Sequence, residues 1–233
     1  MRIAILSDIH SNLPAIRSVF SSIEAMKVDE IYCLGDIVGY GPFPNECIEM
    51  VRKHCTFVTA GNHDYGLVGK TNLDLFNKPG KKVLLWTRKI ITDQNFEYLQ
   101  NLQLMCTRND LTFVHSSPSI PDAWTYVFSI AQAKAAFLDL HTSICFFGHT
   151  HFPIIIGEDS TVNQFKKGTR SLINVGSVGQ PRDGNTMAAY GIFDSAEYSY
   201  SMIRVGYDVQ KTVNAMSEAG LPRVLIHRLL NGV

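Results

Sequence analysis

Metal-binding side chains gather in five short segments of this chain, and each segment follows a run of β-forming apolar residues. Five of the eight histidines fall inside these segments. So many oxygen and nitrogen donors indicate a pair of divalent cations, and such a pair is suited to the hydrolysis of phosphate esters. The segments are Asp8-Ile9-His10, Gly35-Asp36, Gly61-Asn62-His63-Asp64, His115 and Gly148-His149-Thr150-His151.

The donor types narrow the choice of metal. Carboxylate, imidazole and amide groups without thiolate suit Mn²⁺, Fe or Zn²⁺, and they argue against a structural zinc site, which usually contains cysteine. We expect two divalent ions, with Mn²⁺ first and Fe, Zn²⁺, Ni²⁺ or Mg²⁺ as alternatives. A carboxylate can bridge two cations, and Asp36 is the candidate bridge. Two metals about 3.5–4 Å apart can hold a hydroxide between them and aim it in line at phosphorus.

Taken singly, the motifs are weak. Asp8-Ile9-His10 is compatible with a capped turn, and a lone histidine such as His115 is more often a satisfied core residue. Gly61-Asn62-His63-Asp64 and Gly148-His149-Thr150-His151 are sharper, because several metal-capable groups in four residues cost solvation free energy if they are buried unpaired. All five segments together, each at a strand end, make coincidence a poor explanation.

Strand–loop–helix units must position these residues. Because the carboxyl ends of strands in an open α/β sheet converge on one crevice, we expect the five segments to meet there. Asp8 and His10 are expected on an extended segment, with both side chains projecting to one side, and the same spacing holds for His149 and His151. Continuous apolar runs predict strands over residues 3–6, 31–34, 57–60, 111–114 and 144–147.

The remaining pattern alternates helices with further strands. Helices are predicted after Pro14 and near Pro44, and Asp93 and Ser129 are candidate caps for two more. No repeat, low-complexity tract or linker divides the chain, so a single domain over residues 1–233 is expected. The other predicted elements are helices within 72–104, strands over 172–175, 189–193 and 199–205, and helices around 209–216 and 222–230.

Charge and cysteine content bound the partners and the compartment. Lys and Arg number 21, as do Asp and Glu, so no basic field attracts nucleic acid and none is expected as a partner. The five cysteines contain no C-x-x-C pair, which favours buried free thiols in a reducing compartment. The N-terminal apolar run is too short for an export signal, and no stretch approaches the ~18 apolar residues of a membrane span. We therefore expect a cytoplasmic protein without membrane contact.

Taken together, the motifs resemble those of the calcineurin-like metallophosphoesterases, in particular the small bacterial and archaeal phosphodiesterase branch. The family pattern D-x-H, G-D, G-N-H-[DE], a lone His and G-H-x-H is matched over residues 8–151, about two thirds of the chain. The resemblance implies an α/β fold in which a two-sheet β-sandwich is flanked by helices, a four-layer αββα arrangement. It places a dinuclear metal centre at the top of the sandwich.

The resemblance also implies a role for each site residue. His63 would stay off the metals and act near the phosphate as general acid or transition-state donor. Asp64 is the candidate partner that orients His63, although neighbouring side chains on a strand-like segment would point apart. The first metal would be held by Asp8, His10 and His151, the second by Asn62, His115 and His149, and Asp36 would bridge them.

One departure from related enzymes is informative. The Ser/Thr protein phosphatases resemble this chain around Gly35-Asp36 but continue with an Asp that steadies the catalytic His and an Arg that grips phosphate. Gly39 and Tyr40 stand in the corresponding stretch and supply neither group, which disfavours a protein phosphatase.

A second phosphate contact is Arg182, which lies in a loop containing Gly and Pro after the strand predicted over 172–175. It either clamps a phosphate oxygen or forms a surface pair with Asp183. Aromatic residues near the motifs either stack on a base and shape a leaving-group pocket or serve as ordinary packing. They are Tyr40, Phe43, Tyr65, Trp124 and Tyr126.

These inferences favour a metal-dependent phosphodiesterase for small phosphate diesters or nucleotide-like substrates. The alternatives are a catalytically inactive scaffold of the same fold, a nucleotide-binding module, a phosphomonoesterase or protein phosphatase, and a metal-dependent hydrolase of another bond. The presence of His63 and all seven candidate ligands favours an enzyme over a scaffold. The pattern leaves room for a homo-oligomer.

Overall fold

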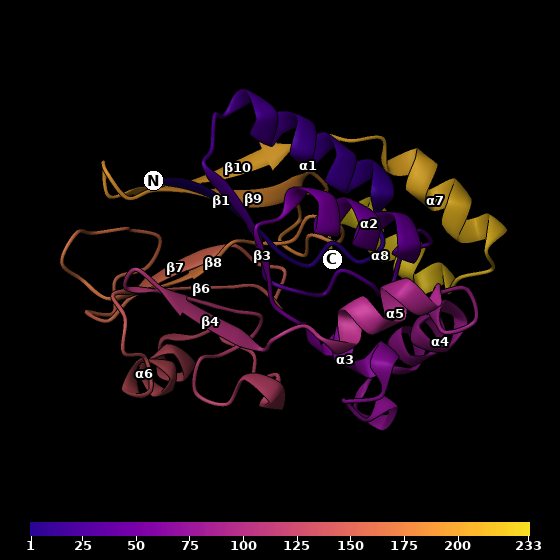
Figure 1. Ribbon diagram of the computed structural model, residues 1–233, viewed down its shortest axis with the longest axis horizontal. Helices are drawn as coiled ribbons and strands as arrows, with labels where there is room; N and C mark the ends of the chain where they lie inside the picture. Colours follow the sequence, from indigo (N-terminus) through magenta and orange to yellow (C-terminus); the bar gives the residue numbers. More distant parts are fainter.

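The apolar runs form strands of two five-stranded sheets, as the computed structural model of residues 1–233 shows (Figure 1). The first sheet has the order β10-β9-β1-β2-β3 and the second the order β4-β5-β6-β8-β7. Three strands of each sheet run parallel: β1, β2 and β3 in the first sheet, and β5, β6 and β8 in the second. The remaining strands pair antiparallel to these or to one another. The bounds are β1 Arg2–Leu6, β2 Glu30–Cys33, β3 Phe57–Val58, β4 Met105–Arg108, β5 Leu111–Val114, β6 Ile144–Phe147, β7 Ile154–Gly157, β8 Ser171–Asn174, β9 Ala188–Asp194 and β10 Ser199–Val205.

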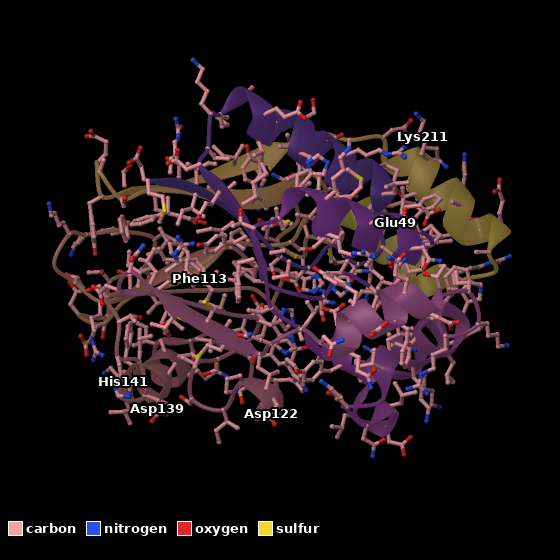
Figure 2. All side chains as sticks on the ribbon, in the orientation of Figure 1. Glu49, Phe113, Asp122, Asp139, His141 and Lys211 are labelled. Carbon is pink, nitrogen blue, oxygen red and sulfur yellow. The ribbon has the colours of Figure 1, made fainter.

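Alternate residues of the strands fill two different cores. Ile3 and Ile5 of β1 point between the sheets, where they join Phe113 and Phe146 of the second sheet, and the two phenyl rings stack with centroids 5.5 Å apart. Ala4 and Leu6 point outward, against the helices. Phe113 lies in the interior between the sheets in Figure 2, whereas the labelled Asp122, Asp139 and His141 lie along the rim.

Helices cover the outer face of each sheet, with α1 at the top of the view and α6 at the bottom (Figure 1). The helix after Pro14 and the Ser129 cap are confirmed; Ser129 accepts a hydrogen bond from Gln132 N. Thr92, not Asp93, caps α5, because its hydroxyl accepts from Asn95 N. The bounds are α1 Leu13–Ala25, α2 Pro44–His54, α3 Asn62–Val68, α4 Lys78–Thr87, α5 Asp93–Gln100, α6 Ile130–Leu138, α7 Val209–Glu218 and α8 Arg223–Asn231, with 3-10 turns η1 Leu73–Leu75 and η2 Pro121–Ala123.

The αββα arrangement predicted for the fold is therefore confirmed, with three local differences. Strand β3 has only two residues, and the strands β4 and β7 were not predicted. The segment that begins at Asn62 is helix α3 rather than a strand-like loop. None of the helices is long and apolar enough to cross a membrane.

Candidate metal centre

The five predicted segments meet at the carboxyl ends of β1, β2, β5 and β6 and at the start of α3. Their ligand side chains are almost completely buried, Asn62 excepted. Five of the seven predicted ligands adopt left-handed backbone angles, a conformation that costs about 1–2 kcal/mol for a residue with a Cβ. Their φ angles are 55° for Asp8, 48° for His10, 51° for Asp36, 65° for His149 and 62° for His151.

These angles correct one expectation. Asp8 and His10 lie beyond the end of β1 in a left-handed turn, not on an extended segment. His149 and His151, two residues apart, do not project to one side: His149 contacts His115, and His151 contacts His10. The left-handed turns therefore distribute the side chains over two neighbouring clusters.

Backbone carbonyls fix the orientation of four imidazole rings. A carbonyl oxygen can only accept a hydrogen bond, so the ring nitrogen facing it carries the proton and the other nitrogen presents a lone pair. The contacts are His10 Nδ1 to Val38 O at 3.0 Å, His115 Nδ1 to Leu34 O at 2.7 Å, His149 Nε2 to Trp124 O at 2.8 Å and His151 Nδ1 to Gln180 O at 2.5 Å.

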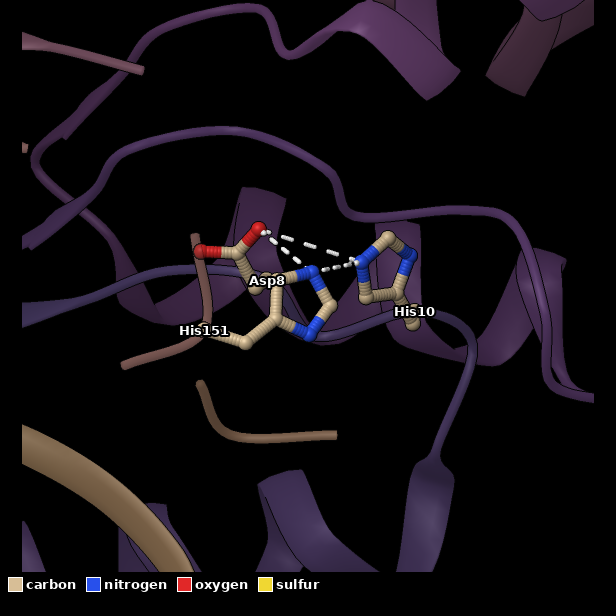
Figure 3. A group of neighbouring side chains, drawn as sticks. All are labelled: Asp8, His10 and His151. Atoms are coloured by element: carbon tan, nitrogen blue, oxygen red, sulfur yellow. Dashed lines mark hydrogen bonds and ion pairs between the residues drawn. The ribbon is translucent and has the colours of Figure 1, made fainter. Parts of the chain in front are cut away.

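The first cluster contains Asp8, His10 and His151 (Figure 3). The Nε2 atoms of His10 and His151 lie 3.0 Å apart, although the carbonyl contacts leave a lone pair on each. Asp8 Oδ1 lies 3.2 Å from His151 Nε2 and 3.8 Å from His10 Nε2, and it has no hydrogen-bond partner. Three acceptors therefore face one another without a donor between them.

The second cluster contains Asp36, His115 and His149. His115 Nε2 lies 3.2 Å from His149 Nδ1, and both atoms present a lone pair when the two rings are neutral. Asp36 Oδ2 lies 3.4 Å from His115 Nε2 and 3.6 Å from His10 Nε2, between the two clusters. Asn62, whose buried Oδ1 has no partner, lines the same pocket.

The pKa shifts of these residues reflect the crowding of buried ionisable side chains. Burial lowers the pKa of His149 to about 3 and of His10 well below its usual range. Burial also opposes the charge on His115, but Asp36 and Asp8 outweigh it and raise the pKa of His115 to about 9. The neighbouring histidines hold the pKa of Asp8 and Asp36 low despite burial.

The donor set fits two divalent cations. When the four imidazoles are neutral, as metal binding requires, their converging lone pairs and the unpaired buried oxygens repel one another, and no side-chain donor in the protein satisfies them. A cation in each cluster removes that repulsion and supplies the missing partner. Asp36, which faces both clusters, fits the predicted bridging position.

His63 forms a third group with His10 and Asp36, in which one possible ligand atom of each residue lies within 4.8 Å of the others. Its buried Nδ1 has no hydrogen-bond partner, its backbone N–H donates to Asp36 Oδ1 at 2.8 Å, and its ring packs edge-on against Tyr40 and Phe76. Gly39, with φ of 95°, passes so close to the ring that a Cβ there would collide with it. Burial lowers the pKa of His63 to about 4, so its ring is neutral at neutral pH.

Asp64 makes contacts other than the predicted one. It is the third residue of α3, and its carboxylate accepts from the backbone N–H groups of Ile37 at 3.0 Å, Val38 at 3.2 Å and Gly61 at 2.9 Å. Burial and Asp36 raise its pKa to about 7, and these N–H groups act in the opposite direction. The carboxylate thus fastens the loop after Asp36 to the start of α3, and it has no contact with the His63 ring.

Arg182 lines a pocket beside the two clusters and is not paired with Asp183, so its role as a phosphate contact stays a prediction. Asp183 pairs instead with Arg204. The Arg182 guanidinium donates to Gln180 Oε1 at 3.1 Å and lies over the Tyr40 ring, 5.7 Å from its centroid. Together with Asp36 and His63 it lines a pocket of about 100 Å³, hereafter the metal pocket.

Some residues of the site carry no signal in the sequence. The four carbonyls that orient the imidazoles belong to the backbone, so any residue type serves at those positions. Leu75, Phe76 and Asn77 also line the metal pocket, and they come from a turn that resembles ordinary connecting chain.

Comparison with known proteins identifies the family. The model of the calcineurin-like phosphoesterase superfamily domain matches residues 1–197. The chain belongs to this superfamily. The matched range contains every segment of the candidate metal centre and Arg182.

Three related proteins match the chain over nearly its whole length. It is 39% identical, over 241 residues, to the uncharacterized protein MJ0912 of Methanocaldococcus jannaschii, covering 99% of this chain and 98% of that protein. A metallophosphoesterase from Sphaerobacter thermophilus is 40% identical, with a TM-score of 0.89 and coverage of 100% and 99%. The hypothetical protein PH1004 from Pyrococcus horikoshii OT3, 21% identical with a TM-score of 0.83 and coverage of 100% and 98%, shares the fold.

Proposed function

We propose that this chain is a dinuclear metal-dependent phosphodiesterase for small phosphate diesters or nucleotide-like substrates. One observation carries the proposal: backbone carbonyls orient four imidazoles so that the lone pairs of the neutral rings, together with two carboxylates, converge on the same small volume. Phosphate ester chemistry agrees with the family, and the metal pocket of about 100 Å³ favours a small substrate.

Each metal position has a defined set of residues. Asp8, His10 and His151 would hold the first ion, and Asp36 would contribute to both positions. Bound cations, with Mn²⁺ as the first candidate, supply a Lewis-acidic site that activates water and offsets the charge of the phosphate. The second ion is held by Asn62, His115 and His149.

The remaining pocket residues bind and protonate the substrate. Arg182 presents a guanidinium to the phosphate, with its direction fixed by Gln180 and Tyr40. His63 lines the same pocket, and we assign its ring the donation of a hydrogen bond to a phosphate oxygen or to the departing alkoxide. Asp64 holds the loop on which both Asp36 and Gly39 lie, and we assign it a positioning role.

The test compares bis(p-nitrophenyl) phosphate with p-nitrophenyl phosphate, using protein stripped by chelation and then reloaded with Mn²⁺. We expect turnover that requires metal and favours the diester. A preference for the monoester would replace the proposed phosphodiesterase by a phosphomonoesterase. Absence of turnover of both compounds after reloading with Mn²⁺ or Fe would contradict the enzymatic function.

The location remains a prediction. Five cysteines are free in the structure, which agrees with a reducing compartment such as the cytoplasm. The single domain over residues 1–233 and a homo-oligomeric state likewise remain predictions, and gel filtration coupled to light scattering tests the latter.

A further inference from the structure

A second pocket, of about 220 Å³, adjoins the metal pocket, and we refer to it as the ring pocket. Five of its eight lining residues line the metal pocket as well, so a molecule held at the metals can extend into it without leaving the protein surface. The shared residues are Asn62, Leu75, Phe76, Tyr126 and His149.

The ring pocket offers apolar walls and no charged group. Its remaining lining residues are Thr71, Ala123 and Trp124, and no Asp, Glu, Lys or Arg contributes. The Thr71 hydroxyl already accepts a hydrogen bond from Trp124 Nε1 at 3.1 Å. The lining therefore favours an uncharged occupant with apolar faces over a second charged group.

Large apolar side chains are left in water at the rim. Leu75 is 76% exposed and Tyr126 is 42% exposed, both beside a polar metal pocket. Apolar groups exposed next to a binding pocket gain free energy when a ligand covers them. The rim thus favours a ligand that brings its own apolar surface.

The wall is held in a fixed position relative to the metal centre. Trp124 adopts a left-handed backbone with φ of 53°, and its carbonyl accepts the proton of His149 Nε2 at 2.8 Å. Tyr126 stacks on the His149 ring with centroids 4.2 Å apart and an angle of 20°. His149, one of the candidate metal ligands, therefore contacts both aromatic residues of the wall.

We propose that the ring pocket binds a flat, uncharged ring carried by one ester substituent of the substrate. An apolar cavity of about 150 Å³ holds a benzene molecule, so about 220 Å³ accommodates a phenyl group or a nucleobase. This inference rests on the proposed function, because the phosphate must lie in the metal pocket for the ring to reach its neighbour. It narrows the substrate to aryl or nucleoside esters of phosphate.

Binding of matched ligand pairs to the Mn²⁺-loaded protein tests the proposal by titration calorimetry. Phenylphosphonate and methylphosphonate share a head group with an unreactive phosphorus–carbon bond and differ in the ring. Adenosine 5′-monophosphate and ribose 5-phosphate differ in the nucleobase. We expect the ring-bearing member of at least one pair to bind roughly tenfold more tightly. A preference within the first pair alone indicates a ring attached directly, and within the second pair alone a ring carried by a sugar.

A pair of leucine variants links the preference to the pocket. Leu75→Asn should reduce the preference for the ring-bearing ligand to less than about threefold. Because Leu75 is exposed, the substitution should leave the protein folded. Leu138→Asn is the matched control, since Leu138 is an equally exposed leucine of α6 that lines neither pocket. A preference that is absent from both ligand pairs in the wild type, or that survives Leu75→Asn, would overturn the inference.

Failure of this inference and failure of the proposed function give different results. If the protein hydrolyses bis(p-nitrophenyl) phosphate but binds both members of each ligand pair equally, the ring-binding proposal is wrong and the proposed phosphodiesterase activity is retained. A ring preference in a protein that hydrolyses no ester retains the pocket and removes the enzymatic function.

Discussion

At the scale of single residues, the metal centre depends on strained and carefully oriented ligands. Asp8, His10 and Asp36 occupy left-handed backbone angles that non-glycine residues seldom adopt. Each of the four imidazoles of the clusters donates one ring proton to a main-chain carbonyl, which leaves a single direction for its lone pair. Strain of this kind persists where the surrounding structure imposes it, as it does here.

His63→Ala separates catalysis from metal binding. Loss of a positioned hydrogen-bond donor to the phosphate should lower kcat for bis(p-nitrophenyl) phosphate by about 10²–10³-fold, as the removal of one donor to a developing anion typically does. The metal content, measured by elemental analysis, should equal that of the wild type because His63 is outside both assigned ligand sets. Loss of a metal ion in this variant would show that His63 is itself a ligand.

Metal binding should release a proton from His115. Its pKa of about 9 means that the metal-free ring is charged at pH 7, and a metal binds only the neutral ring. The apparent affinity for Mn²⁺ should therefore rise with pH up to about 9. The same raised pKa stabilises the metal-free fold below the unfolded pKa of about 6.5, and this contribution is lost as the pH rises through about 9.

Calorimetry at pH 7.5 in buffers of different ionisation enthalpy measures this release. About one proton per protein should leave on metal binding, in addition to protons lost from bound water. Identical heats in all buffers would contradict the assignment of His115 as a ligand.

At the scale of elements, the loops that follow the strands hold the ligands, and small residues let these loops pack closely. A Cβ on Gly148 would collide with Ser7 Oγ and Asp8 Oδ2, whose carboxylate also accepts from His149 N at 2.9 Å. The loop after β6 is therefore fitted against the loop after β1, and the two together complete the first cluster.

Gly148→Ala should disrupt the first metal position more than the fold. Displacement of Asp8 removes one of three ligands, so the Mn²⁺ affinity should fall by at least about tenfold, the lower range for losses in the support of a metal site. Gly206→Ala is the control, because a Cβ there meets nothing within 4 Å and its φ is not positive. Equal metal affinity in both variants, measured by calorimetry, would argue against this packing role.

Apolar continuity in the sequence predicts the central strands well, because residues of β1, β5 and β6 are buried on both faces. It does not predict β4, an edge strand whose residues are mostly exposed, including Met105. The ligand types and their convergence were predicted from spacing and family resemblance. The left-handed turns, the hydrogen bonds of Asp64 with Ile37 and Val38, and the carbonyl contacts depend on tertiary packing, which no local pattern of side chains encodes.

At the scale of the whole molecule, the residues of the candidate metal centre come from both sheets. Asp8, His10 and Asp36 follow strands of the first sheet, whereas His115, His149 and His151 follow strands of the second. Between the sheets, residues such as Phe113 and Phe146 form the shared core. Bound metal should therefore act as a crosslink between the sheets at the site end of the sandwich.

Chelation should lower the melting temperature. A ligand present at about 100 times its Kd stabilises the fold by about 2.7 kcal/mol, equivalent to roughly 5–10 °C for a chain of this size. Differential scanning calorimetry of Mn²⁺-loaded and EDTA-treated protein measures the shift. In Asp36→Asn, which weakens both positions, the difference should be much smaller. Equal melting temperatures with and without metal in the wild type would contradict a crosslink between the sheets.

The central claim is that donors from both sheets bind two cations side by side. The most direct test is an anomalous-difference map from a crystal soaked in MnCl₂. The account predicts two peaks about 3.5–4 Å apart, one next to Asp8, His10 and His151 and the other next to Asn62, His115 and His149, with Asp36 between them. A single peak, or none among these side chains, would contradict it.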